Sequence, residues 1–589
     1  MREHLASETM NDEQTAAGFS GGRSILLPIL AGRPACGPYG PVITYPLNHL
    51  IPPPIPRPFT CIYGIITCLH KSQYWGDFAE KGGFCAVKLT FAVLFSLGLG
   101  LTAVPGAVLA QVAANVPVDS RYYETIDKLS GMGYLSSLPN GARPYSRLQM
   151  AQWALEAKEK AGEKPLPGYL AADLADLESY VAPEVAALQG SGTGGDGFRL
   201  RSFQVGTGYL HGDRFSYRDS RTASEWAPFA GTNGHKKGRN GSMAGEVEAS
   251  GNLGYEVALG IRGRASWDKD NEGTASLEEA YVKTRTGAWA WELGRQAMTW
   301  GQGASGHLLL GNGMKPLTTL QAHLNESIQA GGFLKFLGQV DFHAFYGRLD
   351  GDRAEDAARW GRKDYNHPGL LGLRLDVTPT RWLTLGASRI SMLGGDENGL
   401  SSHDWGKWIY GHNADSQDKW DDIGGFDFRL RLPGVQFYGE MYGEDQAHGL
   451  PSDWGWRGGV YLPQLTRDGS WDLVAEMAHT NKDWYVHGTY QDGWTYSGDI
   501  LGDWMGNDAR KYYARVNHYF PGADRLGLYY QRTEKDRGSD GPVIQETGLT
   551  GRKKLKDAVY LNGTLGYASI KQGAKDHALF AGAEVEWDL

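Results

Sequence analysis

Residues 426–441 have the sequence FDFRLRLPGVQFYGEM, in which apolar and polar side chains alternate on both sides of a Pro-Gly pair. Alternation with a period of two is typical of a β-strand with one apolar and one polar face. Pro433-Gly434 is a turn signal, so the stretch predicts two antiparallel strands joined by a tight hairpin. Its polar face carries Asp427, Arg429 and Arg431, whereas the opposite face is aromatic and aliphatic.

The same alternation recurs in residues 255–262, 371–377 and 579–589. The last of these stretches resembles the closing strand that barrel-assembly machinery reads, with Leu589 in place of the usual terminal Phe or Trp. Residues 198–589, at roughly 20–24 residues per strand and connection, allow about 16–18 strands. We therefore predict a mainly β fold, a large antiparallel transmembrane β-barrel of about 16–18 strands, since a sheet crosses lipid only when it is closed. A water-soluble sandwich is the alternative.

Composition narrows the possible functions. The chain has 589 residues, of which 41% are hydrophobic, and its mean hydropathy of -0.41 argues against a bundle of transmembrane helices. It contains 19 tryptophans and 30 tyrosines. The 58 basic residues are balanced by 67 acidic ones, so there is no broad basic field and we expect no nucleic-acid partner.

The N-terminal part differs from the rest of the chain. All four cysteines precede residue 86, and residues 1–86 include a proline-rich run at 52–58, so we predict a disordered or untranslated extension. Residues 87–110 have a lysine, a short apolar run and a small-residue end, which together predict a signal peptide. A single transmembrane anchor is the alternative. Translation starting at Val87 would leave a cysteine-free mature chain that begins at Gln111.

Residues 111–190 have helical spacing. Tyr123, Ile126 and Leu129 share one face, and Ser146 followed by Gln149 is a helix-capping signal. The glycine-rich segment 191–197 then predicts a linker to the strands. We predict a small N-terminal α-helical domain that packs on something larger, because such short helices bury little by themselves.

Connection lengths predict an orientation for the barrel. Residues 378–381, 433–434 and 521–524 are short turns expected on the periplasmic side, whereas residues 393–424, 445–457 and 480–510 are long segments expected outside the cell. The long segments hold Trp405, Trp408, Trp420, Trp454, Trp456, Trp484, Trp494 and Trp504.

Three motifs in this order resemble the Wzi capsule-assembly family of outer-membrane proteins, and the likeness spans most of the mature chain. The first runs from Gly294-Arg295 through Trp300-Gly301-Gln302-Gly303 to Lys315-Pro316, the second is GEDQAHGLPS at residues 443–452, and the third is Tyr496-Ser497-Gly498 with Gly502, Gly506 and Asp508. Gln302 and Gly311 depart from the family pattern.

This resemblance implies a barrel of about 18 strands in the bacterial outer membrane, with its helical domain in the periplasm. It also implies a surface lectin that binds capsular or exopolysaccharide and helps attach or assemble it at the cell surface. The implied partners are surface polysaccharide, outer-membrane lipid and, during biogenesis, barrel-assembly machinery. Residues 129–134 and 143–147 resemble S-layer-homology modules, so the alternative is a porin-type channel with a periplasmic or cell-wall-binding module.

Flat aromatic rings on outer loops suit sugar binding, so we single out five tryptophans as carbohydrate-binding candidates. They are Trp405, Trp408, Trp420, Trp454 and Trp456. The alternative for each is the aromatic girdle at the lipid interface. Arg295 and Trp300 are further candidates, although the glycine-rich run beside them would let a loop fold inward and give both a bracing role.

Glu440, Glu444 and Asp445 form a predicted acidic cluster in the lumen. We interpret them as solvated charge rather than a glycosidase pair, because nothing in the sequence separates their pKa values. No metal-binding or nucleophile motif stands out, so the sequence predicts no metal, no cofactor and no enzymatic activity.

Overall fold

The computed structural model describes residues 111–136, 138–139, 141–190, 197–212, 216–269, 272–409, 419–447, 450–537 and 540–589. The predicted extension (1–86), the predicted signal peptide (87–110) and most of the predicted linker lie outside the described residues. Within the described ranges, no helix combines the length and the apolar character needed to cross a lipid bilayer.

Eighteen long antiparallel strands among the described residues close into one barrel, which confirms the predicted fold. They are β2 (Gly197–Gly212), β5 (Asn240–Leu253), β6 (Val257–Asp268), β7 (Glu272–Thr286), β8 (Trp289–Gln296), β10 (Leu317–Leu324), β12 (Gln339–Arg348), β13 (Gly369–Thr380), β14 (Leu383–Leu393), β15 (Trp420–Leu432), β16 (Val435–Ala447), β17 (Leu450–Leu462), β18 (Trp471–Thr480), β21 (Arg510–Phe520), β22 (Asp524–Glu534), β23 (Val543–Lys556), β24 (Val559–Gln572) and β25 (Ala574–Asp588). The C-terminal strand β25 closes the ring by pairing with β2.

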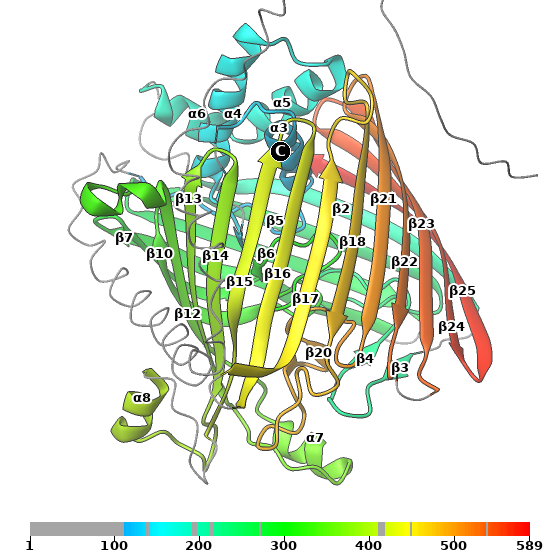
Figure 1. The fold of residues 1–589 in the computed structure, drawn as a ribbon. Helices are drawn as coiled ribbons and strands as arrows, with labels where there is room; N and C mark the ends of the chain where they lie inside the picture. Colours follow the sequence, from blue (N-terminus) through cyan, green and yellow to red (C-terminus); the bar gives the residue numbers. More distant parts are fainter. Residues whose placement is uncertain are drawn as a thin grey trace, which may run out of the picture. The chain divides into compact units, whose positions relative to one another are not determined.

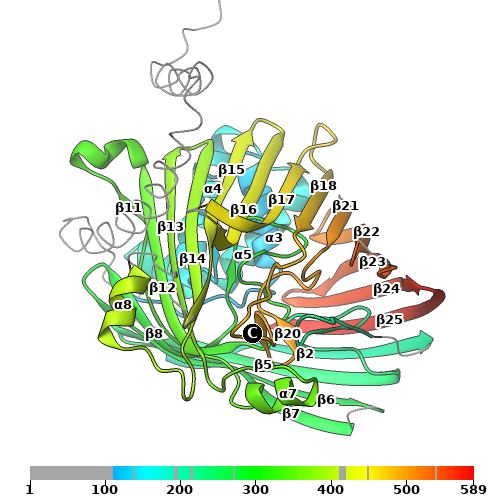
Figure 2. The same ribbon diagram turned by 60° about the horizontal axis from the view of Figure 1, so that its bottom comes forward.

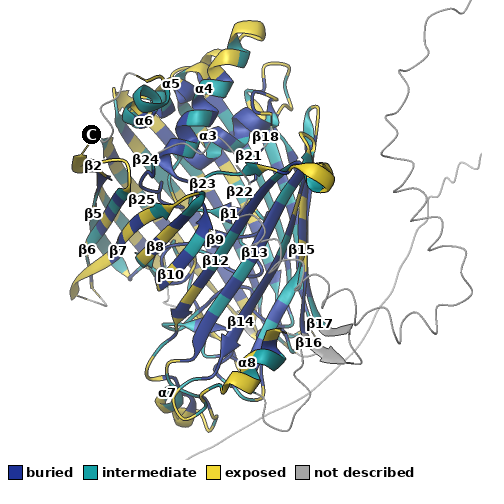
Figure 3. Ribbon diagram, turned by 90° about the vertical axis from the view of Figure 1, so that its left-hand side faces the viewer, coloured by how far each residue is buried: buried dark blue, intermediate teal, exposed yellow. Residues whose placement is uncertain are grey.

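The barrel wall is apolar outside and charged inside. In the hairpin of residues 426–441, Phe426 and Met441 are 57% and 55% exposed, whereas Asp427 is 3% exposed. Figure 3 shows exposed and buried residues alternating along the strands. A protein in water would bury its apolar row and expose its charges, so this inverted pattern indicates that an apolar solvent surrounds the wall.

The two ends of the barrel differ (Figure 1). At one end, here called the helix end, tight turns join β13 to β14, β15 to β16 and β21 to β22, as predicted. At the other, the loop end, β14 and β18 are followed by the predicted long segments 394–419 and 481–509. The third predicted loop, residues 445–457, is wrong, because the alternating pattern continues and pairs this stretch into β16 and β17.

A small helical domain caps the helix end, as predicted. Its helices are α3 (Tyr122–Gly131), α4 (Arg147–Glu163), α5 (Gly168–Tyr180) and α6 (Ala182–Leu188). The predicted cap of α4 is present, since the backbone N–H of Gln149 donates to Ser146 Oγ at 3.1 Å. Apolar side chains such as Ile126 and Leu177 form a shared core.

Buried polar contacts join the helical domain to the barrel. Lys128 Nζ donates to the carbonyl oxygens of Pro463 and Gly469 at 2.6 and 2.8 Å. Glu124 of α3 pairs with Arg525, beside the turn between β21 and β22. Burial opposes the charge of Glu124, but the guanidinium groups of Arg525, Arg515 and Arg552 together outweigh it and lower the pKa of that carboxyl to about 2. This ion pair therefore persists throughout the physiological pH range.

Two long connections fold back into the lumen, and we call residues 297–316 and 481–509 the plug. Apolar side chains from both connections, including Leu308, Trp484 and Trp494, are buried in one hydrophobic cluster. Figure 2 shows β20 inside the ring of strands. The remaining short elements are β1 (Ala142–Arg143), β3 (Tyr217–Arg218), β4 (Glu225–Trp226), β9 (Thr299–Trp300), β11 (Ile328–Gln329), β19 (Thr495–Tyr496), β20 (Asp499–Ile500), η2 (Gly332–Leu337), α7 (Arg353–Arg359) and α8 (Ser402–Ile409).

Candidate functional site

Three of the five candidate tryptophans gather at the rim of the loop end. On α8, Trp405 is 37% exposed and its ring meets that of Trp408 edge-on, with the centroids 5.7 Å apart. Trp408 is buried and its Nε1 donates to Ser391 Oγ at 2.9 Å. Trp420, at the start of β15, is buried in the same cluster. Trp405 therefore offers a ring to solvent, while the other two hold α8 against the rim.

The other two candidate tryptophans, Trp454 and Trp456, lie on β17 and are partly exposed. Arg457 on the same strand is buried inside the lumen, so the alternate positions 454 and 456 face the outer surface. Trp456 pairs across the ladder with Met441, which is itself exposed. This placement favours the aromatic girdle for both residues.

Trp300 and Arg295 have different surroundings. Trp300 is buried, its ring meets Phe345 edge-on with the centroids 5.1 Å apart, and its backbone N–H donates to the carbonyl of Leu310 at 2.9 Å. It therefore braces the plug. Arg295 on β8 is half-buried, and its Nε donates to the carbonyl of Pro316 at 3.1 Å. Its guanidinium lines a cavity described below.

The acidic cluster is dehydrated, so the prediction of solvated charge is wrong for the two members whose side chains are described. Glu440 accepts hydrogen bonds from the backbone N–H groups of Gln302, Gly303 and Leu308 at 2.7, 2.8 and 2.9 Å. Glu444 accepts one from the backbone N–H of Tyr485. Plug amides therefore take the place of water around these carboxylates. The side chain of Asp445 lies outside the described residues.

The glycine-rich run allows this close approach, as predicted. Gly301 has a φ of +139°, and a Cβ there would lie 2.5 Å from Glu440 Oε1. A Cβ at Gly303 would lie 2.7 Å from Arg457 Cδ on β17. Only glycine lets the plug backbone pass so near to the wall at these positions.

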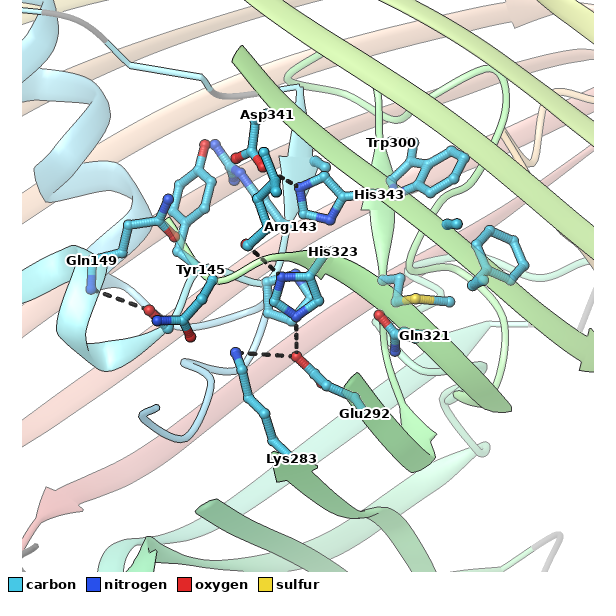
Figure 4. A pocket seen from close by; sticks show the side chains of 18 residues that line it. Arg143, Tyr145, Gln149, Lys283, Glu292, Trp300, Gln321, His323, Asp341 and His343 are labelled. Atoms are coloured by element: carbon cyan, nitrogen blue, oxygen red, sulfur yellow. Dashed lines mark hydrogen bonds and ion pairs between the residues drawn. The ribbon is translucent and has the colours of Figure 1, made fainter. Parts of the chain in front are cut away.

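Figure 4 shows a small polar pocket between the helical domain and strands β8, β10 and β12. Glu292 pairs with Lys283 at 3.1 Å and with His323 at 2.7 Å, and the rings of His323 and His343 stack with their centroids 5.3 Å apart. Its volume of about 20 Å³ has room for about one water molecule, so it does not hold a sugar. No group of three or more His, Cys, Asp and Glu residues in the described ranges is placed to hold a metal ion.

A cavity of about 710 Å³ lies along the inner wall between β2, β5, β6, β7, β24 and β25. Elsewhere on the wall, large side chains such as Arg374 and Arg457 reach into the lumen and are fully buried. Here eight inward-facing wall positions are small or carry hydroxyls: Gly206, Gly208, Ser242, Ala244, Ser266, Ser276, Thr564 and Gly582. The small side chains leave the space unfilled. A second cavity of about 500 Å³, towards the helical domain, shares Lys237, Arg264 and Glu584 with it.

The alternation of apolar and polar residues along single strands does not reveal this cavity. A signal was present, because Gly, Ser and Thr replace charged residues on the polar face of several strands. However, β2 and β5 are separated from β24 and β25 by most of the chain, and only closure of the barrel brings them together. The segment 233–238, Lys315 and Asp499 complete the cavity from the loop end.

Comparison with known proteins gives a consistent picture. A sequence profile of the family described as "Capsule assembly protein Wzi" matches residues 210–584. A Klebsiella pneumoniae protein, described as an uncharacterized 55.8 kDa protein in the cps region, is 28% identical over 176 residues. That match covers 28% of this chain and 33% of the Klebsiella protein, so the chain spans about a third of the length of this relative.

One solved structure shows a similar fold. Escherichia coli Wzi, described as an outer-membrane protein involved in group 1 capsule assembly and a carbohydrate-binding β-barrel, has 19% identity and a TM-score of 0.60. The match covers 81% of this chain and 100% of that one. The match to Pseudomonas aeruginosa OccD3 (OpdP) has 12% identity and a TM-score of 0.39, and it covers 67% of this chain and 92% of the OccD3 chain. The latter score is too low to support an argument about function.

Proposed function

This chain belongs to the Wzi family of capsule assembly proteins, and on that premise we propose that it binds capsular or exopolysaccharide and helps attach or assemble it at the cell surface. The observation that supports this role is the plug. Loops that fill the lumen towards the loop end leave a rigid surface for a polymer rather than a wide pore. The porin alternative is disfavoured for the same reason.

The barrel lies in the outer membrane, and we propose that its helix end faces the periplasm. Short turns face the periplasm in barrels of this kind, and the helical domain caps the end that carries them. The apolar outer wall contacts lipid. We further propose that β25, which closes the ring, is recognised by the barrel-assembly machinery.

We also propose that the protein acts without catalytic turnover. The carboxylates that suggested a glycosidase pair accept hydrogen bonds from backbone amides of the plug, so neither is placed as a free acid or base. Glycan binding by exposed rings and cavity groups needs no covalent step.

A strain lacking this protein is expected to shed a larger fraction of its polysaccharide into the medium, because synthesis continues without attachment. The measurement is the ratio of released to cell-bound polysaccharide at equal total production, with the parent strain and a complemented strain as controls. Unchanged shedding at equal production would contradict the proposed function.

Trp405→Ala is expected to weaken polysaccharide retention several-fold, because stacking of a sugar ring on an exposed indole contributes about 1 kcal/mol. The readout is retention in the complemented strain. Trp382→Ala is the matched control, since Trp382 is similarly exposed but lies at the helix end. Equal retention by the two variants would remove Trp405 from the binding surface.

A further inference from the structure

Three cations that line the 710 Å³ cavity contact no carboxylate directly, although Glu584 attracts Lys237 and Asp499 attracts Lys315 at longer range. Lys237, Lys315 and Arg295 form no ion pair with any residue in the described ranges. By contrast, Lys236 beside them pairs with Asp499 at 3.4 Å. Carboxylates that are not in direct contact balance a confined positive charge only in part, so this group of cations favours an anionic guest.

Carboxylates on the same wall do not cancel this charge. Four carboxylates line the cavity. Glu278 and Asp499 form ion pairs, and Glu584 on β25 accepts a hydrogen bond from Asn562 at 3.5 Å. The fourth, Asp268 at the loop end of β6, has an interaction partner of its own. Five lysine and arginine side chains in the lining against four carboxylates leave a positive balance, which favours an acidic guest over a neutral one.

The cavity also has an aromatic surface. The ring of Phe580 lies across two glycines, because a Cβ at Gly208 or Gly582 would come within 2.9 Å of it. Lys237 Nζ lies 5.5 Å from the centre of this ring. A flat ring next to a cation suits a sugar that carries an anionic group.

We propose that this cavity binds an acidic sugar unit of the polysaccharide, a sugar bearing a carboxylate. Arg295, Lys315 and Lys237 supply its counter-charges. The volume lies within the range of about 300–1,000 Å³ found for small-ligand sites. This inference rests on the proposed function and names the ligand class of that function.

The test uses the full-length protein in detergent and the surface polysaccharide purified from the producing strain. Calorimetry compares three forms of that polymer: untreated, carboxyl-reduced with carbodiimide and borohydride, and treated with hydrogen fluoride to remove phosphate. Carboxyl reduction is expected to weaken binding about ten-fold or more, since it removes charge-assisted hydrogen bonds. Hydrogen fluoride treatment is expected to leave the binding affinity unchanged. If only the hydrogen-fluoride-treated polymer lost binding, the anion would be a phosphate and the proposed carboxylate would be wrong.

Charge-removing variants locate the site. Lys237→Gln and Lys315→Gln are each expected to weaken binding of the untreated polymer several-fold to ten-fold while leaving binding of the carboxyl-reduced polymer unchanged. Lys335→Gln, which alters an exposed lysine of η2 at the helix end, is the matched control. A structural defect would weaken the binding of both polymers, so the selective loss separates recognition from misfolding.

Filling the cavity gives an independent test. Ala244→Trp places a large side chain in the space, whereas Ala265→Trp places it on the exposed outer face of the neighbouring strand β6. Only the first is expected to abolish binding. If the parent protein binds no form of the polymer, the proposed function fails; if it binds all forms equally and the cavity variants bind normally, this inference fails and the function stands.

Discussion

Arg374→Met is expected to lower the free energy of unfolding by about 3–5 kcal/mol, the cost of leaving buried charges without a partner. The Arg374 guanidinium lies fully buried between two carboxylates. It donates to Asp376 at 2.7 and 2.8 Å and to Asp427 at 2.7 and 2.9 Å. Without it, two like charges face each other inside the wall. The measurement is the midpoint of unfolding, followed on gels by the loss of the heat-resistant barrel band.

Two further variants separate charge from packing. Adding Asp376→Asn and Asp427→Asn to Arg374→Met removes the stranded charges, so the triple variant is expected to recover much of the lost stability. Arg381→Met is the matched control, because Arg381 is exposed in the turn between β13 and β14. An Arg374→Met barrel as stable as the parent would show that water or ions reach the wall at this depth.

The sequence predicts the wall of the barrel well. The alternation of Phe426 and Phe428 with Asp427 is a local property, and its period places each side chain on one face of the sheet regardless of what the strand pairs with. The outcome matches, with the phenylalanines outside and the aspartate inside. The same holds for the turns at Pro433-Gly434 and 521–524, because turn chemistry is also local.

The packing inside the lumen depends on contacts between residues far apart in the chain, so the sequence predicts it less well. Trp484 and Trp494 were assigned to a segment facing outside, but the segment folds inward and buries both rings. Trp494 Nε1 donates to Asp421 at 2.7 Å across 73 residues of sequence. Spacing within a loop does not encode such a partner. The cavity was missed for the same reason, since its lining comes from opposite ends of the barrel sequence.

Removing the second plug segment is expected to turn the barrel into an open pore. Replacing residues 482–508 with a short Gly-Ser turn leaves β18 and β21 able to form a hairpin, because His479 already pairs with Arg510 at their loop end. The replacement removes Trp484, Tyr485 and Trp494 from the lumen. Since barrels of 16–18 strands leave an aqueous channel when their lumen is unfilled, planar-bilayer recordings should show large conductance steps that the parent protein lacks.

The control for this experiment is an equally drastic change that spares the plug. Replacing residues 396–417 removes α8, whose Trp408 packs on the rim of the loop end, and leaves the 481–509 segment intact. This variant is expected to conduct as little as the parent, although it loses the exposed ring of Trp405. If the parent already conducted like an open pore, the plug would not close the lumen, and the porin alternative would replace glycan attachment as the better account of the barrel.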